Sequence, residues 1–438
     1  MKKLRSSIKR VYQKTVKSIA FLPTMISFLF FVFFFTIRAF EDTELSHQLA
    51  NIAKPLLVSN IADSRLILGS IIGGLISLIV FSFTMVMLVL NTASSTLSPR
   101  VLPGLITRKN HQVVLGFYVG SLTYSILLVI KLSEQSVPSW GVFFAMLFML
   151  LSFAFFVYFI HSISVSIQVD KIVESIFKET RKGMHARQKK YSALKSQPSF
   201  PETDGWFTLR ANLPGYFKNI DKKQLISILQ EHDLVAEITV DIGFFTVKNY
   251  PFLRVNRDLS NEQELCERIK NCFTFYIEEY VGSHYTFGMK QISEVAVKAL
   301  SPGINDPGTA VKCTDLLFML LLEKLSIPER EFEVDENGKL RVMYRSLTLD
   351  ELLFLNLTPI RQYGQSDSLV MLNLLEGLKN LAYTDQHSKA YTATLTRFSE
   401  SLIVEMKKTI STDQSRERIN RMIGRLNELL DERKLEKI

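Results

Sequence analysis

The sequence predicts a membrane α-helical protein with four transmembrane helices, followed by a cytoplasmic α+β domain that is mainly helical at its C-terminus. Its 438 residues are 47% hydrophobic and 22% charged, too charged for a chain lying wholly in a membrane. The apolar residues are too clustered for a wholly soluble chain, and the composition excludes a disordered chain or a disulfide scaffold. The charge is divided as well, with a net +14 over residues 1–195 and −5 over residues 196–438. The basic excess therefore lies in the half that holds the long apolar runs.

Four segments are long and apolar enough to cross a bilayer. The first contains seven Phe within 20 uncharged residues, which as a helix reach about 30 Å. It is longer than the roughly 7–15 apolar residues of a signal peptide and lacks a small-residue cleavage site, so we interpret it as an uncleaved span. The predicted spans are residues 18–38, 66–91, 113–130 and 140–161, which form a transmembrane domain over residues 1–168.

The loops between the spans differ in charge. Seven basic residues and no acid precede the first span, three basic residues lie between the second and third, and eight follow the fourth. The other two loops are acidic or nearly free of charge. Because Lys and Arg are retained in cytoplasmic loops, we expect both termini to be cytoplasmic.

Few polar residues lie within the spans. The pairs Gly69/Gly73 and Gly116/Gly120 have the small-xxx-small spacing that lets helices approach closely. No span contains an acidic residue, which argues against ion-coupled transport. His161 is expected near the cytoplasmic interface, as a hydrogen-bonded interfacial side chain or a proton relay. The polar segment 91–100 at the exit of span two suits either a helix end, broken at Pro99, or a vestibule lining a pore.

The second half changes in character. A basic helix and linker are predicted over residues 169–204, a small α+β module over 205–257, and a helical domain over 258–438 with one β-hairpin near 331–343. In the module, Asp221 is expected to cap a helix over residues 221–231. In the hairpin, Asn337-Gly338 suits a type I′ turn.

Two short motifs in the helical domain are candidate functional or structural sites. In residues 299–310, Asp306 is placed to cap a helix that begins at Pro307, with freed backbone groups bonded by nearby polar side chains. In residues 359–364, Arg361 presents a planar fork of donors suited to a carboxylate, a phosphate or buried carbonyls. The candidate residues of the two motifs are Ser301, Pro302, Asn305, Asp306, Pro307, Thr309, Arg361, Gln362 and Tyr363.

Several motifs together resemble one known family. They are Ser98-Pro99-Arg100, Leu115-Gly116-x-x-x-Gly120-x-x-x-Tyr124, Phe159-Ile160-His161, Gly215-Tyr216 with Ile220-Asp221, and residues 299–310 and 360–364. The chain resembles the bacterial predicted membrane protein family known as domain of unknown function 2254 over nearly its whole length. The resemblance implies an integral protein of the bacterial plasma (inner) membrane with a cytoplasmic C-terminal domain. It carries over no established activity. One departure is Ile242-Gly243-Phe244-Phe245, where the family usually has a Gly-Asp-Phe turn.

No motif for enzyme chemistry is found. The sequence lacks a phosphate-binding loop, a dinucleotide fingerprint, a nucleophile elbow and an HExxH zinc motif, so we predict no catalytic residues, no cofactor and no metal. The three cysteines are expected to be buried thiols. The acidic second half argues against nucleic-acid binding.

The function is therefore open between classes. The first hypothesis is an oligomeric channel or passive transporter that its cytoplasmic domain gates or assembles. The alternative is a membrane-anchored sensor or scaffold, in which residues 299–310 and 361–363 line a cleft for an anionic ligand or a protein partner. A lipid-modifying enzyme is a third, unsupported hypothesis. The expected partners are the lipid bilayer and further copies of the chain.

Overall fold

The chain forms two compact units, Met1–Ile172 and Val173–Ile438, called here the membrane unit and the C-terminal unit. A computed structural model describes residues 20–96, 109–133, 137–166, 168–192, 198–276, 284–328, 330–430 and 434–438. Each unit is built around its own core and is described by itself.

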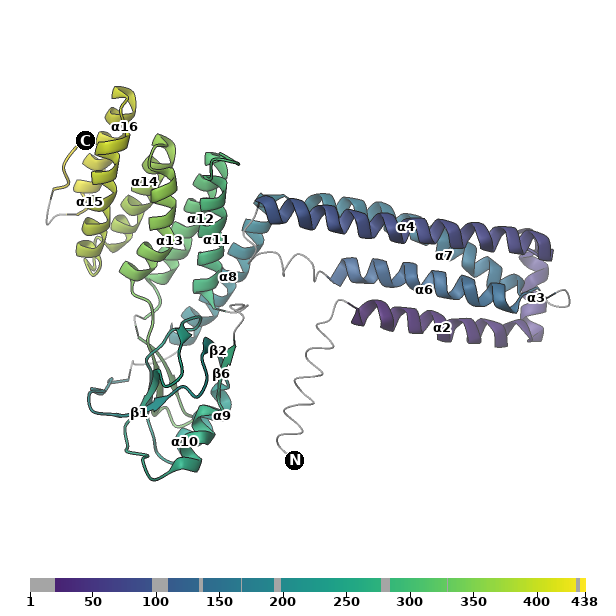
Figure 1. Cartoon of the computed structure of the whole chain (residues 1–438), viewed down its shortest axis with the longest axis horizontal. Coiled ribbons are helices and arrows are strands. Elements are labelled where there is room, and N and C mark those ends of the chain that lie inside the picture. Colours follow the sequence, from purple (N-terminus) through teal and green to yellow (C-terminus); the bar gives the residue numbers. More distant parts are fainter. Residues whose placement is uncertain are drawn as a thin grey trace. The chain divides into compact units, whose positions relative to one another are not determined.

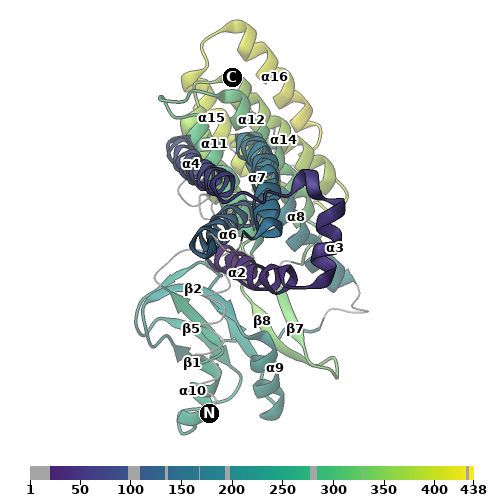
Figure 2. The same cartoon turned by 90° about the vertical axis from the view of Figure 1, so that its right-hand side faces the viewer.

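Four long helices make up the membrane unit, and Figure 1 and Figure 2 show them running side by side. Each is long and apolar enough to cross a membrane, so the predicted four-helix membrane fold is confirmed. Their bounds are α2 Phe21–Glu41, α4 Ile61–Thr96, α6 Lys109–Lys131 and α7 Ser139–Ser166.

A short helix, α3 (Glu44–Ile52), and a 3-10 turn, η1 (Lys54–Leu56), follow α2. The Thr43 hydroxyl accepts the backbone N–H of Ser46 and caps the first turn of α3. This helix was not predicted from the sequence, in which the loop is notable only for its charge. The connection between α2 and α4, at this end of the helix bundle, is therefore partly helical.

Glycine and aromatic residues pack the bundle. A Cβ at Gly116 would lie 2.9 Å from the Pro23 Cα, and one at Gly120 would lie 2.5 Å from the Phe30 ring. This pair on α6 therefore lets α2 approach closely. Added Cβ atoms at Gly69 and Gly73 on α4 would meet nothing within 4 Å, so the second small face is open within one chain.

The basic helix α8 (Val169–Ser192) begins close to its predicted start. Arg and Lys side chains of α8 make ion pairs with acids of later elements in the C-terminal unit: Arg181 Nε with Glu323 Oε1 at 2.5 Å, Arg187 Nε with Glu331 Oε2 at 3.1 Å, and Lys190 Nζ with Glu333 Oε2 at 2.5 Å. The basic side chains of α8 thus join this helix by ion pairs to the rest of the C-terminal unit.

Two sheets and two helices form the α+β part. One sheet has the strand order β1-β5-β3-β8-β7 and the other β4-β2-β6. The elements are β1 Phe207–Arg210, β2 Gly215–Ile220, α9 Lys222–Glu231, β3 Ala236–Ile238, β4 Phe245–Thr246, β5 Pro251–Val255, α10 Gln263–Lys270, β6 Phe273–Tyr276, β7 Glu331–Val334 and β8 Leu340–Tyr344. The Asp221 side chain accepts the Gln224 N–H and caps α9 as predicted.

The hairpin β7–β8 differs from the sequence-based expectation in two ways. Strand β8 pairs in parallel with β3, with Glu237 opposite Met343, so the hairpin belongs to the sheet of the α+β part and not to the helical segment. Its turn is not type I′, since only Gly338, with φ of 78°, has a positive φ there. The Gly338 N–H donates to the Asp335 carbonyl at 3.0 Å, as in a type I turn that ends in a left-handed glycine.

Six helices complete the unit and lie at the end opposite the sheets (Figure 1). Each of them buries several apolar residues, and a mainly helical C-terminal region with some strands is confirmed. They are α11 Tyr285–Ala299, α12 Pro307–Lys324, α13 Leu349–Gly364, α14 Ser368–Asp385, α15 Thr392–Thr409 and α16 Asp413–Asn427.

Candidate functional site

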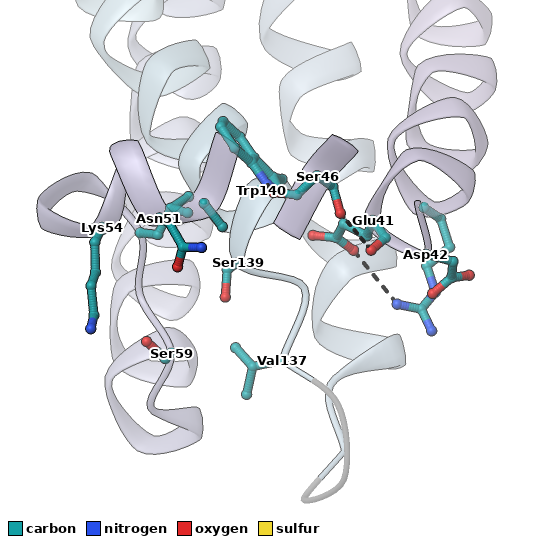
Figure 3. Close-up of a pocket in the computed structure, with 12 residues that line it drawn as sticks. Glu41, Asp42, Ser46, Asn51, Lys54, Ser59, Val137, Ser139 and Trp140 are labelled. Atoms are coloured by element: carbon teal, nitrogen blue, oxygen red, sulfur yellow. Dashed lines mark hydrogen bonds and ion pairs between the residues drawn. The ribbon is translucent and has the colours of Figure 1, made fainter. Parts of the chain in front are cut away.

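A cleft of about 630 Å³ lies at the end of the membrane unit where α2 ends and α7 begins. We call it the α3 cleft, because α3 and η1 form one of its walls. Figure 3 shows its polar side chains, with Lys54 and Glu41 on opposite sides. The lining residues are Arg38, Glu41, Asp42, Ser46, Ala50, Asn51, Lys54, Leu57, Ser59, Val137, Ser139 and Trp140.

Glu41, the last residue of α2, is the buried acid of the α3 cleft. Its side chain is 9% exposed, and its Oε1 accepts the Gly141 N–H at 2.9 Å. Its Oε2 lies 3.5 Å from Arg38 Nη1. This oxygen is buried and has no hydrogen-bond donor in the part of the chain that the structure describes. One oxygen of the carboxylate is therefore hydrogen-bonded to the backbone, and the other is held only by the longer ion pair with Arg38.

Two aromatic residues form hydrogen bonds to the backbone close to Glu41. The Trp140 indole N–H donates to the Ser46 carbonyl at 3.3 Å and ties the start of α7 to α3. The fully buried Tyr124 donates its hydroxyl to the Gly141 carbonyl at 3.2 Å. Gly141 thus bonds both Glu41 and Tyr124, so Tyr124, a candidate from the sequence, supports the α3 cleft from the bundle side.

The charges around the α3 cleft are balanced. Arg38 and Lys54 are basic, and Glu41 and Asp42 are acidic. A ligand with an ammonium group and an anionic group could interact with the acidic and the basic side chains at the same time. A singly charged ion could not. These residues were not predicted as a site, although the adjacent acids Glu41 and Asp42 directly follow an apolar span in the sequence.

The motif over residues 299–310 forms a turn between α11 and α12. The Asp306 carboxylate accepts the Thr309 N–H at 3.0 Å and the Thr309 hydroxyl at 2.5 Å, and Pro307 is the first residue of α12, as predicted. These hydrogen bonds hold the pKa of Asp306 below its usual value. Ser301 donates its hydroxyl to the Lys298 carbonyl, and Asn305 takes a left-handed φ of 48°. The turn is bonded mainly within itself.

Arg361, in the last turn of α13, contacts α15. Its Nη1 donates to the Ser401 hydroxyl at 2.7 Å, and its guanidinium lies 5.9 Å from the centre of the Phe398 ring. Gln362 and Tyr363 are exposed.

The two motifs meet only through apolar atoms in the contacts that the structure gives. A Cβ on Gly364 would lie 3.3 Å from Leu300 Cδ1. Pro302 is exposed in the turn, whereas the guanidinium of Arg361 is bonded to α15. The polar side chains of the two motifs therefore do not converge on one another.

Of the remaining candidates, the structure describes His161, which lies at the other end of the membrane helices. His161 is exposed on the last turns of α7. On the same stretch, Tyr158 accepts a hydrogen bond from the Asn110 amide at 2.8 Å. Ser98, Pro99 and Arg100 lie outside the described residues.

The cysteines and acids suggest no redox or metal centre. Cys266, Cys272 and Cys313 are buried free thiols. Burial raises the pKa of Cys272 to about 11, which keeps this thiol protonated and unreactive. Within the described ranges, no group of three His, Cys, Asp or Glu side chains is placed to hold a metal ion.

A family defined by sequence matches most of the chain. The match covers residues 16–380, and the family is described as "Predicted membrane protein (DUF2254)". The chain belongs to this family. The prediction made from the short motifs is thereby confirmed, and the protein is a predicted membrane protein of unknown function.

Two similar proteins come from mycobacteria. Uncharacterised proteins of Mycobacterium bovis and Mycobacterium tuberculosis are 23% identical to the chain over 334 residues. The aligned region is 73% of this chain and 64% of each relative, so the chain spans less than two thirds of their length. No solved structure matches.

Proposed function

We propose that this member of the family is a receptor of the bacterial inner membrane that binds a small zwitterionic solute in the α3 cleft. The observation that carries the proposal is the buried Glu41 Oε2, whose partner in the described part of the chain is Arg38 Nη1 at 3.5 Å, beyond the usual length of a charge-assisted hydrogen bond. A buried carboxylate oxygen held only by a long ion pair is incompletely stabilised, and an ammonium group in the cleft would supply closer donors. Lys54, on the opposite side of the cleft, would meet the anionic group of the same solute.

The charge of the loops supports an orientation for this receptor. Both termini would be cytoplasmic, because the basic residues gather in the loops on that side. The α3 cleft would then open on the outer side, and the C-terminal unit would lie in the cytoplasm. Since α8 starts three residues after α7 ends, and its ion pairs fasten it to the C-terminal unit, a shift of α7 would reach that unit along the chain.

Isothermal titration on the detergent-purified full chain tests the binding step. The probes are β-alanine, γ-aminobutyrate and phosphoethanolamine, with butylamine and butyrate as singly charged comparisons. We expect heat from a zwitterion only, and at least tenfold weaker binding in Glu41→Gln, which keeps an acceptor for the Gly141 N–H. Glu44→Gln removes an exposed acid of α3 that does not line the cleft and should bind normally. Equal binding of all probes, or unchanged binding in Glu41→Gln, would refute the site.

Hydrogen exchange tests the receptor step. Addition of the binding zwitterion should change the exchange of α8 in wild type and leave it unchanged in Glu41→Gln. A cleft that binds without any change in α8 would be a binding site and not a receptor.

A second candidate function is the oligomeric channel or passive transporter. The observation that favours it is the open small face of Gly69 and Gly73, which would let a helix of another copy approach closely. Reconstituted wild type should then conduct ions or pass solutes, and Gly69→Leu should lower both the flux and the oligomer size. Liposomes that show no flux under voltage, tension or zwitterion would exclude this function.

A further inference from the structure

We propose that α16 carries a second ligand site, for a small phosphate-bearing anion. A cavity of about 310 Å³ lies between α14 and α16, lined by Arg418, Arg421, Arg425, Leu372 and Met422. The proposal concerns the C-terminal unit alone and does not depend on the α3 cleft.

The helical period explains why the arginines gather. Ile419, Met422 and Ile423 are buried and hold one face of α16 against the core. Residues 418, 421 and 425 follow at i, i+3 and i+7, so their side chains are neighbours on one side of the helix. Three arginine side chains therefore border one open cavity, which Leu372 and Met422 line with apolar atoms.

The local charge is unusual for this unit. Residues 416–425 contain four Arg and one Glu, although residues 196–438 as a whole are net negative. Arg416 already donates through Nε to the Ile410 carbonyl at 3.0 Å. Glu417 Oε1 lies 3.7 Å from Arg421 Nη2, and among the described residues no ion pair or side-chain hydrogen bond is found for the guanidinium groups of Arg418 and Arg425. The positive charge bordering the cavity is thus only partly balanced.

The chemistry of the lining specifies the ligand class. Guanidinium groups bind phosphate through paired, charge-assisted hydrogen bonds, and several of them match an anion with two or more charges. The apolar lining by Leu372 and Met422 suits a small organic group attached to the phosphate. Such a phosphate belongs either to a free solute or to the headgroup of an acidic lipid, and both share the same contacts.

Titration of the full chain with inorganic pyrophosphate tests the site. In neutral detergent we expect saturable binding, with Arg418→Gln and Arg425→Gln each weakening it about tenfold, as expected for the loss of one charge-assisted contact. Arg397→Gln is the matched control: Arg397 lies on α15, pairs with Asp350 at 2.8 Å and does not line the cavity. It should bind as wild type does.

A steric variant separates a site from a merely basic surface. Leu372→Trp keeps every charge and fills the cavity, so it should abolish pyrophosphate binding while the melting temperature shows that the fold persists. Binding that survives Leu372→Trp, or that falls equally in Arg397→Gln, would overturn the proposal. Glu41→Gln should leave pyrophosphate binding unchanged. The result of this titration is therefore independent of whether the α3 cleft binds a zwitterion.

A second arm identifies the source of the phosphate. The full chain in nanodiscs of neutral lipid, with and without cardiolipin, is titrated with pyrophosphate. Competition by cardiolipin that Arg418→Gln relieves would assign the site to lipid headgroups, and pyrophosphate binding unaffected by cardiolipin would assign it to a free solute. If neither phosphate source binds, the site does not exist.

Discussion

Asp241 is expected to make the stability of the C-terminal unit depend on pH. Burial raises its pKa from the usual 3.8 to about 6. Arg345, whose Nε lies 3.9 Å from the carboxylate, opposes this rise, and the charges of Glu351 and Glu331 add to it. Replacing Asp241 by Asn removes the charge while keeping the shape of the side chain.

The sign and the size of the effect follow from linkage. The pKa of Asp241 is higher in the folded than in the unfolded chain, so its stabilising proton is fully bound below about pH 4 and is lost as the pH rises through 6. A shift of about two units corresponds to about 3 kcal/mol of unfolding free energy. Asp241→Asn should therefore be about 3 kcal/mol more stable than wild type at pH 8, and nearly equal to it at pH 4.

Tryptophan fluorescence provides the assay. The chain has two Trp, and in a Trp140→Phe background Trp206 reports on the C-terminal unit, where it packs near Phe332. Urea unfolding of the full chain in detergent is followed at pH 4 and pH 8. Asp204→Asn, at an exposed position in the same unit, should change the unfolding free energy by less than about 0.5 kcal/mol. A difference that is the same at both pH values, or an Asn variant less stable at pH 8, would refute the reasoning.

Two further substitutions test packing. Gly116→Ala should destabilise the membrane unit by roughly 1–3 kcal/mol, because the added Cβ would lie 2.9 Å from the Pro23 backbone and overpack this contact. Gly69→Ala is the control and should leave the stability unchanged; an equal fall in melting temperature for both variants, measured by circular dichroism, would contradict this prediction. Arg361→Ala removes the hydrogen bond to Ser401 and should cost about 1–3 kcal/mol in urea unfolding; unchanged stability with lost activity would assign Arg361 to a ligand instead.

Local chemistry explains what the sequence could predict. Apolar length alone locates the four membrane helices, since a bilayer demands about 20 such residues. Helix caps are equally local, and Asp221 and Asp306 each accept a backbone N–H three residues ahead. Both features depend on neighbours within one or two turns, so no knowledge of the distant chain is needed.

Contacts between distant residues explain what the sequence could not predict. Glu41 and Gly141 are 100 residues apart, and the α3 cleft exists only because the ends of α2 and α7 meet. Arg361 was recognised as a donor fork, yet its partner Ser401 lies 40 residues away on another helix. The parallel pairing of β8 with β3 likewise joins strands that no local pattern connects.

The aromatic core of the bundle bears on the choice between receptor and channel. The rings of Phe33, Tyr124 and Phe148 lie with centroids 5.3 to 5.8 Å apart. A water-filled path through this core would separate ring pairs worth about 0.5–1.5 kcal/mol each beyond their burial. A conducting path is therefore more easily built between copies, at the open face of Gly69 and Gly73, than through one bundle. Gly69→Leu separates the two functions, because it should abolish a path between copies and leave zwitterion binding in the α3 cleft unchanged.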